Sequence, residues 1–140
     1  VNPSAFLSNQ IKSAPITNQS TAAITGLKVP NGKSLLLVGG DINLQSGILN
    51  AQGGYIELGG LAGSGNIALN TDTDFLKLSF PENAQLANVS LTNGAAINVL
   101  GQDGKIVINS QDFSIDKSSL RIGSSRTTQE ANLIINAQGN

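Results

Sequence analysis

The chain has 140 residues and a formal net charge of −1, with 12 % charged and 4 % aromatic side chains and no Cys or His. The lack of Cys and His excludes a disulfide framework, thiolate or imidazole metal ligands, and nucleophilic catalysis by Ser-His or Cys-His pairs. The small net charge offers no electrostatic footprint for nucleic acid, whereas 37 Leu, Ile and Val residues are enough to build a core.

The first 33 residues are predicted to form an irregular leader. Three of the four prolines, Pro3, Pro15 and Pro30, lie in this segment, and its apolar residues are scattered. The step Asn31-Gly32 is a turn signal that leads into the first strong strand. We therefore expect residues 1–33 to be a leader or cap with short strands, and residues 34–140 to hold the repeated elements.

From residue 34 onward the pattern changes to short pairs of apolar residues separated by one position. This spacing of two is the period of a β-strand, in which residues i and i+2 point to one face. The pairs are Leu35/Leu37, Ile42/Leu44, Ile56/Leu58, Ile67/Leu69, Leu76/Leu78, Val89/Leu91, Ile97/Val99, Ile106/Ile108, Phe113/Ile115, Leu120/Ile122 and Leu133/Ile135. Gly-Gly, Asn-Gly, Asp-Gly and Ser-Gly steps separate them, so the sequence predicts strands joined by tight turns.

The pairs also recur at a longer period of 20–25 residues. One series comprises Leu35, Ile56, Leu76, Ile97 and Leu120, and a looser one comprises Ile42, Ile67, Val89, Phe113 and Leu133. Two or three short strands per period are typical of a solenoid, in which each coil stacks on the previous one by parallel pairing. We expect about 4–5 coils, with Leu, Ile and Val inside and polar residues such as Asn43, Glu57 and Ser90 facing outward.

Several stretches resemble one family. The most specific is KVPNGKSLLLVGGDINLQSGILNAQGGYIELGGLAGSGNIAL (28–69); VNPSAFLSNQI at the start, LKLSFPENAQLANVSLTNGAAINV (76–99), DFSIDKSSLRIG (112–123) and ANLIINAQG near the end add to it. They are similar to the filamentous-haemagglutinin-like exoproteins of two-partner secretion systems, particularly the cyanobacterial type. The stretch SSRTTQEA (124–131) departs from the pattern because it lacks glycine.

The resemblance implies a right-handed parallel β-helix that forms part of a large secreted or surface adhesin. It implies an outer-membrane β-barrel transporter as partner, with this segment forming the later part of the secretion domain or the first coils of the stalk. Host, cell-surface or polysaccharide ligands are further candidate partners. The resemblance provides no catalytic residues, and we expect a non-enzymatic protein with no catalytic, cofactor-binding or metal-binding residues and no cofactor.

The alternative is a carbohydrate-active or carbohydrate-binding β-helix protein, and the enzymes of this kind act on polysaccharides with clustered acids. The candidate pairs are Asp72 with Asp74, Asp41 with Glu57, and Asp112 with Asp116. A turn role is the favoured interpretation of Asp72 and Asp74, because a calcium site needs about six to eight oxygen ligands and none is obvious nearby.

The remaining motifs also favour structural roles. The glycine-rich stretch 59–65 lacks the Lys-Ser/Thr of a phosphate cradle and is predicted to be a loop between coils. Phe80 and Phe113 keep the register of the inward residues and are predicted core residues. Tyr55 and Phe75 alternate outward, where an aromatic side chain more often covers the sheet or pairs across strands than binds a sugar.

Overall fold

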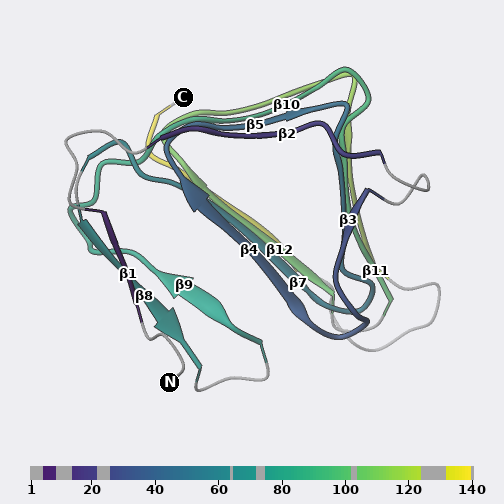
Figure 1. Cartoon of the computed structure of the whole chain (residues 1–140), viewed down its shortest axis with the longest axis horizontal. Helices are drawn as coiled ribbons and strands as arrows, with labels where there is room; N and C mark the ends of the chain where they lie inside the picture. Colours follow the sequence, from purple (N-terminus) through teal and green to yellow (C-terminus); the bar gives the residue numbers. More distant parts are fainter. Residues whose placement is uncertain are drawn as a thin grey trace.

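The chain folds as a parallel β-helix. The computed structural model describes residues 5–8, 14–21, 26–63, 65–71, 75–101, 104–123 and 132–139, and the regular elements in them are all β-strands. Three four-stranded parallel sheets form the sides of a triangle when the molecule is viewed along the stacking direction (Figure 1). The all-β parallel helix predicted from the sequence is therefore confirmed, whereas its right hand and the number of coils stay predictions.

The three sheets are named here I, II and III. Sheet I contains β2 (Ile16–Asn18), β5 (Ile42–Gln45), β10 (Val89–Thr92) and β13 (Phe113–Asp116). Sheet II contains β3 (Leu27–Lys28), β6 (Ile48–Asn50), β11 (Ala96–Leu100) and β14 (Ser119–Gly123). Sheet III contains β4 (Ser34–Gly39), β7 (Tyr55–Gly60), β12 (Lys105–Ser110) and β15 (Asn132–Ala137). One strand from each sheet, taken in chain order, makes one turn of the stack.

The inward positions of the strands stack in register and form the core. In sheet III, Leu35, Ile56, Ile106 and Leu133 occupy equivalent positions, and the inner Ile56 and Ile106 are 0 % exposed. The outer turns leave their inward residues more accessible, and Leu133 is 43 % exposed. The aliphatic ladders expected from the spacing of two are thus present, since each turn buries the apolar face of its neighbour.

The stacking predicted from the period of 20–25 residues is only partly correct. Residues 61–88 leave the stack between β7 and β10, and we call this segment the excursion. It contains β8 (Gly65–Asn70) and β9 (Lys77–Ser79), which pair antiparallel, and β8 also pairs antiparallel with β1 (Ala5–Ser8). Figure 1 shows these strands outside the triangle, beside sheet III. Ile67 and Leu76 are therefore not members of the coil ladders.

Because of the excursion, the two predicted series combine residues from different ladders. Ile42, Val89 and Phe113 do stack in sheet I. Ile97 and Leu120 instead stack with Leu49 in sheet II. Leu133 stacks on Ile106 rather than on Phe113. A nearly constant spacing in sequence therefore did not identify equivalent positions, since the excursion adds a length close to that of one turn.

The predicted leader contributes strands to the stack. β2 and β3 lie within residues 1–33 and add parallel strands to the edges of sheets I and II. A capping role for residues 1–33 stays a prediction. The side chain of Phe6 and the stretch 124–131 lie outside the described part of the chain.

Two corners of the triangle each repeat a device of their own in successive turns. Between sheets I and II, Ser46, Asn93 and Lys117 each adopt a positive φ (61, 56 and 49°), which turns the chain sharply. The Asn93-Gly94 step lies at this turn, as the sequence predicted.

At the corner before sheet I, the Asn88 backbone N–H donates to Asp41 Oδ1 (2.9 Å) and the Asp112 N–H donates to Asn88 Oδ1 (3.2 Å). Each Asx side chain thereby ties its turn to the next one.

Candidate functional site

The excursion covers the outer face of sheet III with a second, smaller apolar cluster. Leu61, Ile67 and Leu78 form its buried centre, and Leu36 and Val38 of β4 pack against it. Phe80 also belongs to this cluster and therefore not to the coil core that its register predicted. The lack of a side chain at Gly59 leaves room for the Phe80 ring, because a Cβ on Gly59 would overlap Phe80 Cζ.

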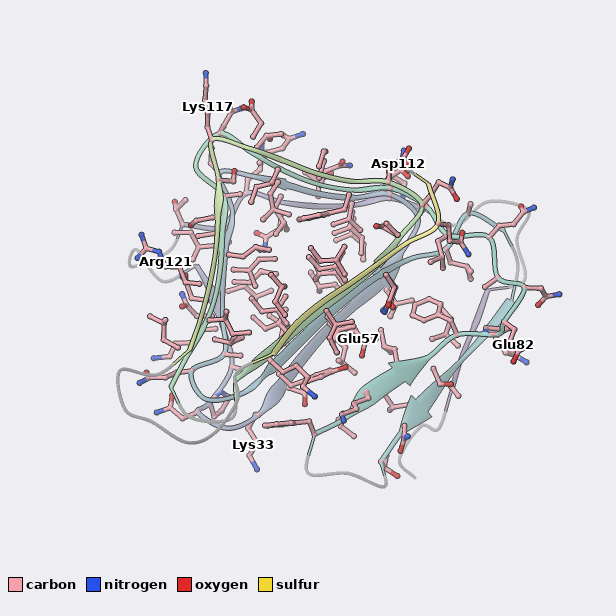
Figure 2. The ribbon with its side chains drawn as sticks, turned by 180° about the vertical axis from the view of Figure 1, so that it is seen from behind. Lys33, Glu57, Glu82, Asp112, Lys117 and Arg121 are labelled. Carbon is pink, nitrogen blue, oxygen red and sulfur yellow. The ribbon has the colours of Figure 1, made fainter. Side chains whose placement is uncertain are left out.

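A buried carboxylate lies between the excursion and sheet III. Glu57 on β7 is 2 % exposed and accepts hydrogen bonds on both of its oxygens. Oε1 accepts from the Tyr55 hydroxyl (2.5 Å) and from the Leu78 backbone N–H (2.9 Å), and Oε2 accepts from Asn109 Nδ2 (2.7 Å). Figure 2 shows the Glu57 side chain pointing from the sheet toward the excursion. Three donors offset the cost of removing a carboxylate from water.

The bond from Leu78 also protects a strand edge. β9 pairs with β8 along one side only, and the Leu78 N–H points away from β8 toward Glu57. An unpaired strand edge is a site of unwanted pairing with another chain. The Glu57 carboxylate therefore caps the edge of β9 while it joins the excursion to the stack.

Tyr55, the single tyrosine, completes this contact. Its ring stacks on Phe75 with centroids 5.7 Å apart, and Lys77 Nζ lies 5.8 Å from the ring centroid. The ring is 3 % exposed. Burial raises the pKa of Tyr55 far above its ordinary value of 10.0, and the hydrogen bond to Glu57 and the charge of Glu57 raise it further. This stacking agrees with the prediction that the two aromatic side chains cover the sheet face.

The neck of the excursion, where residues 60–62 lie beside residues 84–87, is held by backbone pairing and by the side chain of Gln138. The Ala62 N–H donates to the Gln85 carbonyl (2.8 Å), and the Ala87 N–H donates to the Gly60 carbonyl (2.9 Å). Gln138, which follows β15, accepts from the Leu86 N–H (3.0 Å) and donates to the Ala84 carbonyl (2.8 Å). A hollow of about 220 Å³ lies beside this neck, and its polar lining comes from Asp41 and Asn88.

The candidate acid pairs do not assemble into a catalytic site in the described residues. Asp72 and Asp74 lie outside the described part. Asp41 accepts a hydrogen bond from the Asn88 N–H at the corner, whereas Glu57 accepts one from the Leu78 N–H of the excursion. No group of three or more Asp, Glu, His or Cys residues suited to a metal ion occurs where the structure is described. In the part of the chain that the structure describes, there is no helix long and apolar enough to cross a membrane.

Sequence reasoning missed the role of Glu57. It placed this residue among the outward polar positions. Glu57 does point away from the core of the coils, but it is not exposed to solvent, because the excursion buries it. A charged residue between two aliphatic residues, Ile56 and Leu58, was the available signal. The role of Gln138 left no recognisable pattern.

The comparisons with known proteins decide the family. A family model described as the TPS secretion domain, where TPS stands for two-partner secretion, matches residues 1–108. The chain belongs to the TPS secretion domain family. No curated protein and no solved structure gives a match.

This assignment confirms that the chain is part of a two-partner secretion exoprotein. Its secretion domain implies an outer-membrane transporter as partner and secretion through that transporter. The cyanobacterial type stays a prediction. The match includes the whole excursion and ends one residue before Asn109, so it also includes Glu57 and the neck.

Proposed function

We propose that this secretion domain is a non-enzymatic part of a large secreted or surface adhesin, and that the excursion is the surface its transporter recognises. The coil stack presents similar strands turn after turn. The excursion departs from this repeat and carries contacts of its own with the stack, through Glu57 and the apolar cluster around Leu78. Recognition of one partner requires such a unique surface, since a repeated one offers several equivalent registers.

The stack has a second role in this proposal. Parallel ladders make a stiff rod whose turns contact only their neighbours, so folding can propagate from one turn to the next without ATP. A rod of this kind suits a stalk that holds adhesive surfaces away from the cell. Retention of the exoprotein at the cell surface, with host or polysaccharide ligands for its adhesive part, belongs to the same proposal.

The observation that carries the proposal is the separately held excursion inside the matched segment. The test measures the amount of this chain that reaches the medium from cells that contain its outer-membrane transporter. Leu76→Asp and Glu82→Lys change exposed residues of the excursion, and Arg121→Glu changes an exposed residue of sheet II as a control. We expect the exported amount of each excursion variant to fall by about tenfold, as binding does when an interface residue is changed. The exported amount of the control should match that of the parent chain.

Export must depend on the transporter for the measurement to count, and circular dichroism must show that the variants keep their strands. Normal export of both excursion variants, or loss of export only in Arg121→Glu, would show that recognition lies elsewhere.

A further inference from the structure

Two side chains that hold the excursion come from beyond the matched segment. Asn109 lies near the end of β12, and Gln138 follows β15. Both are later in the chain than residue 108. Gln138 contacts the excursion (residues 61–88) directly, whereas Asn109 contacts Glu57, whose carboxylate holds the Leu78 N–H of the excursion. The excursion, which lies within the matched segment, is therefore held in part by residues outside that segment.

Asn109 connects three turns of the stack to the excursion. Its Nδ2 donates to Glu57 Oε2 (2.7 Å), and its Oδ1 accepts from Asn136 Nδ2 (3.0 Å) on β15. Asn109 is 7 % exposed, so its amide is fixed by these partners rather than by water. Asn136 thus orients Asn109, Asn109 orients Glu57, and Glu57 holds the Leu78 N–H of β9.

Gln138 replaces a strand partner at the neck. Its amide oxygen accepts from the Leu86 N–H and its amide nitrogen donates to the Ala84 carbonyl. One side chain thereby satisfies a donor and an acceptor on the same short segment, as a neighbouring strand would. Gln138 directly follows Ala137, the last residue of β15.

We propose that Asn109 and Gln138 are positioning residues of a late latch, which fixes the excursion on sheet III only when β12 and β15 have joined the stack. Any folding order that proceeds from β2 toward β15 produces the excursion before Asn109 and Gln138, although Glu57 and β4 are already present. Its meaning for secretion rests on the proposed function: the transporter would meet the excursion while it is still loosely held, and completion of the last turn would fix it.

The first test measures amide hydrogen exchange in the full 140-residue chain. The variants are Asn109→Ala and Gln138→Ala. The reporters are the Leu78 amide for the first variant and the Ala62 amide for the second, because neither donates to the substituted residue. We expect about tenfold faster exchange at the matching reporter, since each variant leaves buried or half-buried groups without a partner. The Val89 amide of the stack, which donates to Asp112, should keep its rate.

Matched controls separate the latch from a general loss of polar contacts. Asn43→Ala removes the bond from Ser90 Oγ in sheet I, and Gln45→Ala removes the bond from Gln19. Neither should alter exchange at Leu78 or Ala62. Gln138→Glu keeps an acceptor for Leu86 but loses the donor to Ala84, so it should lie between the parent chain and Gln138→Ala. Unchanged reporters in both alanine variants, or equal acceleration at Val89, would overturn the latch.

The second test addresses the order of events. Pulse labelling during refolding of the unchanged chain should protect the Leu78 and Ala62 amides together with, or after, the amides of β15. Protection of the excursion before β15 contradicts the proposal. Both tests use the isolated chain, so they do not depend on the transporter. A functioning latch together with normal export of the excursion surface variants would disprove the proposed recognition role alone.

Discussion

The coil stack and the excursion use the same kinds of residue but are stabilised in different ways. In the stack, each inner turn is covered on both sides, and a continuous core of residues such as Ile56, Leu91 and Ile106 is 0 % exposed. The excursion has a centre of three buried apolar residues and depends on a few polar bonds at Glu57 and Gln138. The difference indicates that the stack unfolds as one unit, whereas the excursion can open locally at a lower free energy.

The largest expected effect concerns the stack. Leu91→Ala should lower the free energy of unfolding by about 2–5 kcal/mol, because Leu91 is 0 % exposed and its removal leaves a cavity. Urea unfolding followed by circular dichroism measures this loss. Leu78→Ala, which affects the excursion, should instead accelerate exchange in β8 and β9 while the midpoint of the main transition changes little. A shared transition with equal losses would show that the two regions form one cooperative unit.

The next effect concerns the contact between the two regions. Gly59→Ala should destabilise the docked excursion by about 1–3 kcal/mol, because the new methyl group would overlap the Phe80 ring. The double variant Gly59→Ala with Phe80→Ala should recover part of this loss relative to the sum of the single changes. Strict additivity of the two changes, measured by amide exchange at Leu78, would contradict the packing explanation.

A pH-dependent effect follows from Tyr55. Its folded-state pKa is raised, so the stability that this group contributes is present below the ordinary value of 10.0 and is lost as the pH rises above it. The loss should be about 1.4 kcal/mol per pH unit above that value while Tyr55 stays protonated in the fold. The ultraviolet absorbance of tyrosinate should appear only on unfolding, since the chain has one tyrosine.

Glu57→Gln provides the control for this titration. It removes the charge and places an amide N–H against one of the existing donors, so the Tyr55 pKa should fall toward its ordinary value although burial remains. An unchanged tyrosine titration in Glu57→Gln would mean that the carboxylate has no part in the shift.

The smallest effect concerns the corner before sheet I. Asn88→Ala should cost about 0.5–1.5 kcal/mol, because it removes the acceptor for the Asp112 N–H at an exposed position. Ser90→Ala, which removes a bond to Asn43 on the neighbouring strand, is the control, and a change within about 0.5 kcal/mol is expected. Equal losses in chemical unfolding would show that the corner has no special weight.

The sequence predicted the stack well because its signal is local. A spacing of two beside a turn step, on both sides at Ile42/Leu44 and after the pair at Val89/Leu91, depends only on neighbouring residues, and these pairs are indeed buried. The stacking partners of these residues were predicted less well, because they depend on how many residues lie between successive turns. Ile67 and Leu76 keep the strand period, but Ile67 lies in the antiparallel strand β8 and Leu76 lies directly before β9, both outside the stack.

The candidate site could not be predicted for a related reason. Glu57 contacts Leu78 and Asn109, which lie 21 and 52 residues away in sequence, and no periodic pattern connects them. Its burial depends on the excursion folding back over sheet III. The family resemblance identified the class of protein, but it could not reveal which side chains join the excursion to the stack.

The corner formed by Asp41, Asn88 and Asp112 has a further consequence for how such chains can diversify. At this corner two residues suffice to connect β4 to β5 and β12 to β13, yet 28 residues are accommodated between β7 and β10 without changing the pairing of Val89 with Ile42. The side-chain bonds across the corner align Asn88 with Asp41 and Asp112 after this insertion. The corner is thus a splice point, where new segments can be added to the rod or deleted from it while the turns on either side stay aligned.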